Sequence, residues 1–267
     1  MTDGRPARIW SLVAAQAARH GGRVSAADAC VAAVAAVDVT GAWLMAANGE
    51  QGGHLMRVTD KASEVLAELQ LTLGEGPGPD ATASGGPVLA SDLDEMEAVR
   101  RWPAFAPAAR QAGAAAIFAF PLQLGAIRTG VMSLYRVRSG PLSAFQLGDA
   151  LIFADSATLL LLDAQDQSAQ DQLVRDRSAP DQLARTARSA ATGPGGQPAD
   201  LTRHRAEIDQ ATGMLTEQLG VGIGEAFIRL RAYAYAHDRR LSDLARDIVA
   251  RRLRLSPDPD PRKDAQG

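Results

Sequence analysis

The sequence predicts an α+β domain built on one antiparallel sheet, followed by an all-α module of three short helices. Three observations lead to this prediction. Between residues 26 and 162, short β-type runs joined by glycine-containing turns alternate with periodic helical stretches. Residues 166–200 are rich in Asp, Gln, Ser and Ala and end in a Gly/Pro run typical of a linker. After this linker, apolar residues recur at three- and four-residue steps up to about residue 252.

Composition limits the class of protein. The chain has 267 residues, of which 46% are apolar but only 4% aromatic, so alanine supplies much of the hydrophobicity and a helix-rich protein is expected. The single cysteine, Cys30, excludes a disulfide framework within one chain and favours a cytoplasmic protein. We expect no leader segment and no window of about 18 apolar residues, and therefore no membrane contact.

The elements of the first domain follow one another with clear boundaries. A turn is expected at Asn48-Gly49 and another around Gly125–Gly130, because these residues favour tight reversals between strands. A Gly/Pro loop is expected after residue 71. The expected helices are 26–37, 61–71, 104–111 and 143–162, and the expected strands are 39–46, 54–58, 88–90, 116–124 and 131–137. Helices on both sides of a run of hairpin-linked strands indicate an α+β fold.

The glycine-rich segment has a recognisable motif. The stretch LGEGPGPDA at residues 73–81 is followed by GPVLASDL at residues 86–93. Together they resemble the GAF family of sensor domains, and the resemblance covers residues 10–165. It implies an antiparallel sheet flanked by helices and a pocket for a small-molecule ligand between the sheet and the helices, near the Gly74–Asp80 loop.

The candidate ligand-binding residues are Trp43, Met45, Met56, Gly76 and Asp80. Large or adaptable apolar side chains on the hairpin strands suit a ligand pocket, but ordinary core packing and a structural turn account for them equally well. GAF sensors bind cyclic nucleotides, haem, small aromatics or nothing. No residue here selects one of these, so the sequence assigns no cofactor and no metal.

Three helices are expected after the linker. Ile208 and Leu215 belong to an apolar stripe that Gly220 can end as a left-handed cap. The second helix is expected to begin after Gly222, with Glu225 as the carboxylate half of a capping box. The third is expected to run from 241 to about 252, after the polar break at 237–240. Three such helices can bury a shared core.

The stretch IDQATGMLTEQLGVGIGEAFIRLRAYAYAHDRRLSDLARDIV, which begins at Ile208, resembles the ANTAR domain. We therefore expect an ANTAR RNA-binding domain over residues 201–255. The resemblance implies an antiterminator that binds structured RNA, namely paired hairpins in nascent transcripts. The sequence departs from the family pattern at Thr212, where lysine is common, and at Gly222, where a hydroxyl residue often caps the helix.

Six residues are candidates for RNA contact, because they are small, cationic or able to stack on bases. Each has an alternative role. Gly213 could serve helix packing, Arg231 an internal salt bridge, and Tyr233 the edge of the core. The turn arginines could be a solvated pair. The candidate RNA-binding residues are Gln210, Gly213, Arg231, Tyr233, Arg239 and Arg240.

Other function classes fit less well. The four histidines have no cysteine or carboxylate neighbours at metal-ligand spacing, and neither a GxSxG elbow nor a phosphate-loop Gly-Lys-Ser/Thr occurs, so we expect no enzyme. A DNA-binding regulator is an alternative, although Asp243 and Asp247 on the third helix would repel phosphates. A protein-interaction module is a further alternative.

Four consecutive leucines, Leu159–Leu162, predict a homodimer. They cannot all face one core, so some of them must find a second apolar surface.

Overall fold

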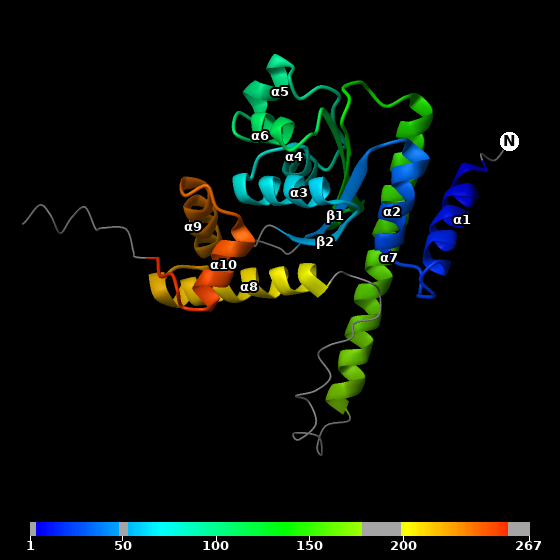
Figure 1. Cartoon of the computed structure of the whole chain (residues 1–267). Coiled ribbons are helices and arrows are strands. Elements are labelled where there is room, and N and C mark those ends of the chain that lie inside the picture. The colour runs from blue at the N-terminus through cyan, green and yellow to red at the C-terminus, as the bar shows by residue number, and fades with distance from the viewer. Residues whose placement is uncertain (1–3, 48–52, 178–198, 256–267) are drawn as a thin grey trace, which may run out of the picture.

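The computed structural model describes residues 4–47, 53–177 and 199–255 (Figure 1). The helices of these residues are α1 (Arg5–Ala18), α2 (Ala26–Val37), α3 (Lys61–Leu73), α4 (Pro77–Ser84), α5 (Met96–Arg101), α6 (Phe105–Gln111), α7 (Ala144–Arg177), α8 (Ala199–Leu219), α9 (Ile223–Ala236) and α10 (Leu241–Val249). The strands are β1 (Gly41–Ala46), β2 (His54–Val58), β3 (Val88–Ala90), β4 (Ala116–Leu124) and β5 (Ile127–Arg136).

The five strands form one sheet in the order β2-β1-β5-β4-β3, and every neighbouring pair is antiparallel. The two longest strands, β4 and β5, form a hairpin at the centre of the sheet. Strand β1 and most of β4 and β5 are buried residue after residue, with no alternation between buried and exposed positions. This pattern requires that helices cover both faces of the sheet. The predicted α+β class is confirmed.

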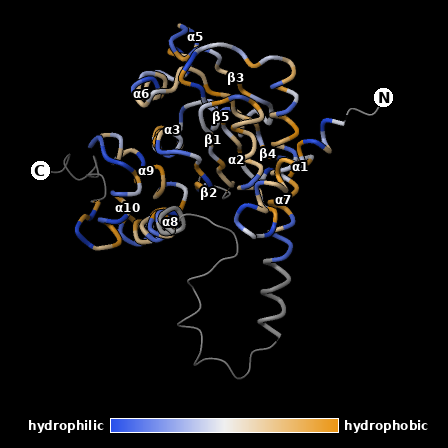
Figure 2. The backbone as a smooth tube through the Cα atoms, turned by 45° about the vertical axis from the view of Figure 1, so that its right-hand side comes forward, coloured by the Kyte–Doolittle hydropathy of each residue, from blue (hydrophilic) through white to orange (hydrophobic). Residues whose placement is uncertain are grey.

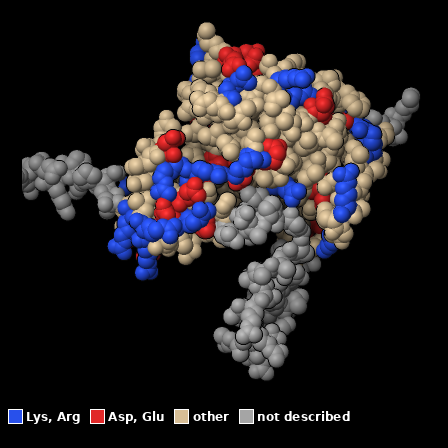
Figure 3. Space-filling view, in the orientation of Figure 1, with Lys and Arg blue, Asp and Glu red and all other residues tan. Residues whose placement is uncertain are grey.

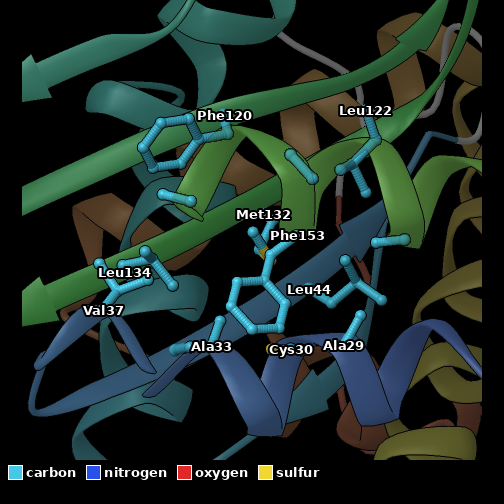
Figure 4. Close-up of a cluster of buried hydrophobic side chains, with 14 of the residues drawn as sticks. Ala29, Cys30, Ala33, Val37, Leu44, Phe120, Leu122, Met132, Leu134 and Phe153 are labelled. Carbon is cyan, nitrogen blue, oxygen red and sulfur yellow. The ribbon is translucent and has the colours of Figure 1, made fainter. Parts of the chain in front are cut away.

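Helices α2 and α7 cover one face of the sheet, with α1 outside them (Figures 1 and 2). Between these helices and the sheet lies a core in which the Phe153 ring of α7 sits among side chains such as Leu44, Met132 and Leu134 (Figure 4). Cys30 of α2 belongs to the same core, and burial raises the pKa of its thiol to about 12. Cys30 is therefore a protonated packing residue.

Helices α3, α4 and α6 cover the opposite face. The core on this side is built around fully buried side chains that include Trp43, Leu66, Leu93, Phe105 and Ile117. The sheet is thus the middle layer of three, and its two cores share β1, β4 and β5.

Helix α7 is longer than expected. It runs to Arg177, so the predicted linker, 166–200, begins within a helix and ends at the start of α8. Its segment Ala144–Gln167 is long and apolar enough to cross a membrane, which contradicts the expectation that the sequence has no such window. The inner residues of α7, among them Ala157 and Leu161, are buried in the core. Its apolar character is therefore that of a core helix.

Some elements were missed from sequence. Helices α1 and α5 were not expected, α4 begins at Pro77 rather than at the Asp80-Ala81 helix start that the GAF resemblance implies, and β5 begins at Ile127 rather than Val131. Gly130 was assigned to the turn, but it lies within the strand, where an added Cβ would be 2.1 Å from the Met45 carbonyl oxygen. A loop was expected at the start of α4 because glycine and proline, which are frequent there, usually indicate a loop. Proline nevertheless fits the first turn of a helix, where its missing N–H costs nothing.

Three predictions fall outside the described residues. These are the turn at Asn48-Gly49, the central part of the linker at 178–198, and the tail after Leu255.

The last three helices share their own core, as predicted. Its large buried members are Leu215, Phe227, Leu230, Leu241, Leu244 and Ile248. Gly220 ends α8 with a φ of +65°, and its amide donates to the Thr216 carbonyl oxygen.

Gly222 is the N-cap of α9, as expected, but the predicted capping box is wrong. The Glu225 carboxylate accepts hydrogen bonds from Arg229 instead, one turn along the helix. Helix α10 ends at Val249, earlier than the expected residue 252.

The three-helix module lies against the sheet domain. Helix α9 contacts α3, and α8 contacts the edge strand β2 (Figure 1). Leu71 of α3 packs onto the core of the module. On β2, burial and then the positive charge of Arg205 lower the pKa of His54 to about 4, and its Nδ1 is buried without a hydrogen-bond partner among the described atoms. The contact between β2 and α8 therefore keeps His54 neutral.

This arrangement predicts that stability falls as the pH drops from the unfolded-state pKa of 6.5 towards about 4. In this window the unfolded chain takes up a proton at His54 that the folded chain excludes. We expect His54→Gln to be less sensitive to acid than the wild type in urea unfolding at pH values within and above the window. His237→Gln, which changes an exposed imidazole, is the matched control. If the two variants show the same pH dependence, the buried neutral state of His54 is refuted.

Candidate nucleic-acid interface and sensor cavity

Two glutamates of α3 hold the predicted RNA-binding residue Arg240. Its guanidinium lies 3.2 Å from Glu64 Oε1 and donates a short hydrogen bond from Nε to Glu68. Ser242, at the start of α10, adds hydrogen bonds from its amide and its hydroxyl to Glu68 Oε1, at 3.3 and 2.6 Å. Burial raises the pKa of Glu64, but hydrogen bonds from Lys61 and Arg240 outweigh it and hold the pKa below its usual value. Arg240 is thus engaged within the chain.

Arg231 also points at the sheet domain. Its Nε donates to the Thr72 carbonyl oxygen at 3.0 Å, and its guanidinium lies over Gly74, the left-handed C-cap of α3. A Cβ at Gly74 would be 1.8 Å from a terminal nitrogen of Arg231, so a side chain here would displace the guanidinium from this position. Burial lowers the pKa of Arg231, and the described residues place no carboxylate within ion-pair distance. The internal salt bridge, which was the alternative role for Arg231, is therefore absent from the described part of the chain.

The other predicted RNA residues lie within the module or at its surface. Arg239 pairs with Asp247 at 2.5 Å, and the Tyr233 ring stacks on His237 with a centroid distance of 3.9 Å. Gln210 is exposed on α8, and a Cβ added at Gly213 would meet no atom within 4 Å. The small size of Gly213 is therefore not needed for helix packing, which was the alternative role considered for it.

An exposed aromatic residue of α9 is absent from the predicted RNA-binding set. Tyr235 of α9 is 61% exposed, whereas Tyr233 is partly covered by the core of the module. The two side chains lie about half a helical turn apart, so they point to opposite sides of α9. If the buried side of the helix is misjudged from sequence, the wrong tyrosine is taken as the exposed one.

Arginines and aspartates alternate around a surface hollow of about 410 Å³ beside α10 (Figure 3). Asp247 binds both Arg239 and Arg252, and Arg246 lies near Asp243 and Glu207. These pairs offset most of the arginine charge. The acidic side chains of α10 are therefore neutralised by their neighbours, which weakens the repulsion of phosphates expected from sequence.

A second cavity, of about 340 Å³, lies where α9 meets the sheet domain. The sheet domain supplies the ends of β1 and β5, the last turns of α3, and α4, while α9 supplies Phe227 and Arg231. Its size falls within the range of small-molecule pockets, about 300–1,000 Å³. It lies near the predicted Gly74–Asp80 loop, but one of its walls comes from the three-helix module.

The predicted ligand residues are divided between this cavity and other places. Met45 lines the cavity, and Gly76 lies beside it as the N-cap of α4. Trp43 is fully buried in the core beneath α3, and Met56 packs against the core on the opposite face of the sheet. Asp80 accepts hydrogen bonds from Arg101 and the Trp102 indole, so it serves the structure of the loop. Met56 therefore lies on the face of the sheet opposite the cavity, whereas Trp43 shares the face of Met45 but is enclosed in the core and does not reach the cavity.

Sequence reasoning missed Gln70, Arg128 and Phe227 as residues of this cavity. From the sequence pattern, Gln70 is expected to be an ordinary polar residue of an amphipathic helix, and Phe227 is expected to be a core residue. The sheet end and α9 come together only in the tertiary fold, so no local pattern identifies their shared cavity.

The comparisons with known proteins match two different parts of the chain. The ANTAR domain family model matches residues 201–249. No curated protein matches the chain. Among solved structures, the chain is similar to the GAF domain of a phosphoenolpyruvate-protein phosphotransferase from Coxiella burnetii, with 13% identity and a TM-score of 0.47 over 61% of this chain and 98% of that one.

Two further similar structures are GAF domains. One, from an Acinetobacter phosphoenolpyruvate-protein phosphotransferase, has 12% identity and a TM-score of 0.46, over 63% of this chain and 99% of that one. The other, GAF-B of DevS from Mycobacterium smegmatis, has 19% identity and a TM-score of 0.38, over 62% and 98%. Residues 201–249 thus match the ANTAR domain family, and the antiparallel-sheet domain before them is similar to these GAF domains.

Proposed function

We propose that this protein is an RNA-binding transcription antitermination regulator, without enzymatic activity, whose sheet domain senses a small molecule. The observation that carries the proposal is the match of residues 201–249 to the ANTAR family, in a segment that folds as three helices around their own core. ANTAR domains are known as RNA-binding antitermination modules. We place the protein in the cytoplasm, where nascent transcripts are available.

The outer face of α8 is the part of the proposed RNA surface that is open in this structure. Gln210 and Gly213 are three residues apart and therefore lie next to each other on the helix. The amide of Gln210 can read base edges, and the bare backbone at Gly213 allows a nucleic-acid strand to come close. The arginines around α10 lie beside this face, and a phosphate backbone would have to compete with their carboxylate partners to reach them.

Two arginines of the proposed RNA surface are occupied by the sheet domain. Arg240 binds Glu64 and Glu68, and Arg231 binds the Thr72 carbonyl oxygen. A phosphate backbone must compete with these partners for both guanidinium groups. The docked arrangement is therefore the state with the lower RNA affinity, and undocking raises the affinity.

We also propose that the protein forms a homodimer through α7. Leu161 is buried in the core, whereas Leu159 is 49% exposed. Leu151 is also exposed and precedes Leu159 by eight residues, so the two lie on one face of the helix. A second copy of the same face offers the matching apolar surface that both need, in the self-complementary manner of a twofold dimer.

We expect full-length protein to bind a two-hairpin RNA more tightly than a DNA duplex of equal length in a filter-binding assay. Gly213→Ala should weaken RNA binding, because the new methyl group stands where the strand approaches. It should also leave the fold intact and stabilise α8 by up to about 1 kcal/mol. Gly86→Ala, which likewise adds a methyl group in open space, is the control in the sheet domain. Equal binding of RNA and duplex DNA would favour the alternative of a DNA-binding regulator.

The double variant Glu64→Gln plus Glu68→Gln should bind RNA more tightly than the wild type. Partly exposed ion pairs contribute about 0.2–1 kcal/mol each, so loss of both should raise the affinity by up to roughly thirtyfold. The control is Glu95→Gln plus Glu97→Gln on and beside α5, which makes the same change in net charge at exposed positions. An equal gain in both double variants would mean that net charge, and not undocking, sets the affinity.

Leu159→Glu should convert a dimer to a monomer, since a charge on this face cannot be buried against its copy. Light scattering of the purified protein at tens of micromolar checks this outcome. Leu124→Glu places the same charge at an exposed leucine of the β4–β5 hairpin and should leave the dimer unchanged. A wild-type monomer with and without RNA would refute the dimer.

A further inference from the structure

The cavity between the two domains has a distinct chemical character. Its lining includes the guanidinium groups of Arg128, on β5, and Arg231, on α9, and no aspartate or glutamate among the described residues. Arg128 donates to the Thr82 carbonyl oxygen and Arg231 to the Thr72 carbonyl oxygen, and neither has a carboxylate partner in the described part of the chain. Two cations without a counter-charge make the cavity attractive to an anion.

A buried amide adds a third donor. Gln70 lines the cavity and is only 1% exposed. Its Oε1 accepts a hydrogen bond from the Gly78 amide at 2.6 Å, which fixes the orientation of the group, and its Nε2 is buried with no partner among the described atoms. Buried amide nitrogens nearly always have an acceptor, so the free Nε2 indicates that an acceptor belongs there.

The remaining wall is apolar. Met45, Leu71 and Phe227 face the cavity from β1, α3 and α9 respectively. A ligand that fits these surroundings combines an acidic group with a hydrophobic body. Inorganic phosphate alone satisfies the donors but leaves the apolar wall without a partner.

We propose that this cavity is a binding site for a small organic anion, whose carboxylate or phosphate group is held by Arg231, Arg128 and the Gln70 amide while its apolar body lies against Met45, Leu71 and Phe227. The planar guanidinium groups suit either acidic group, because each offers paired N–H donors. The site is shared by two domains, so it is complete only when α9 is docked on the sheet domain.

This shared construction has a regulatory consequence, which rests on the proposed function. A ligand that contacts both domains binds the docked state more tightly than the undocked one, and so shifts the population towards docking. Docking occupies Arg231 and Arg240 with partners of the sheet domain. The anion therefore lowers the affinity for RNA.

Binding of the anion can be measured without RNA. We would titrate full-length protein with benzoate and with phenyl phosphate, using calorimetry and thermal unfolding, and with benzamide as a neutral molecule of the same shape as benzoate. At least one of the two anions should bind and raise the melting temperature, and benzamide should not. Arg231→Gln and Arg128→Gln should each weaken anion binding by about tenfold, as expected for loss of a charged hydrogen bond. Arg100→Gln, at an exposed site on α5, should bind as the wild type does.

Arg128→Gln keeps the test decisive if Arg231→Gln disturbs docking, because Arg128 lies on the sheet and donates its hydrogen bond to Thr82 of its own domain. The proposal is overturned if neither anion binds at millimolar concentration, if benzamide binds as well as benzoate, or if Arg128→Gln retains full affinity. The regulatory part is tested separately by adding the bound anion to the RNA assay. An anion that binds but leaves RNA affinity unchanged overturns the coupling, whereas a protein that binds the anion but no RNA overturns the proposed function alone.

Discussion

The half-buried carboxylate of Glu68 is the group on which the relation between the two domains depends. It accepts hydrogen bonds from the Arg240 guanidinium and from both the amide and the hydroxyl of Ser242. A charge in such a position is stable only when its partners are in place, because removal from water costs more than a single bond returns. The start of α10 is therefore held at one point of α3, and this contact sets where α9 lies.

Once α9 is placed, the rest of the interface follows from short-range contacts. Leu71 meets the core of the three-helix module, and Arg231 reaches the end of α3. The guanidinium of Arg231 gives up part of its hydration there, which is reflected in its lowered pKa. A cation that is desolvated without a counter-charge is an unusual use of arginine in a purely structural contact. The position of Arg231 is better explained if its guanidinium forms part of an anion-binding site.

Local patterns were enough to predict most of the fold. Strands β2, β3 and β4 and helix α2 have the predicted bounds because their sequences are strongly periodic or are closed by turn residues. The left-handed cap at Gly220 was predicted for the same reason. The candidate site was harder to predict, because Met45, Gln70 and Arg231 come from three distant parts of the chain. Which carboxylate meets Arg240 is likewise a property of the tertiary fold, since Glu64 and Glu68 are more than 170 residues away.

The C-cap of α3 illustrates a limit on how freely these domains can be recombined. Gly74 satisfies two requirements at once: its positive φ ends the helix, and its missing side chain admits an arginine from another domain. Asparagine could meet the first requirement but not the second. A chimaera that joins this ANTAR domain to a different sensor would therefore need a glycine at the matching helix end to keep this contact, and acidic residues about two and three turns before it. Each domain can fold with its own core, but the interface between the two domains is specific to this pair.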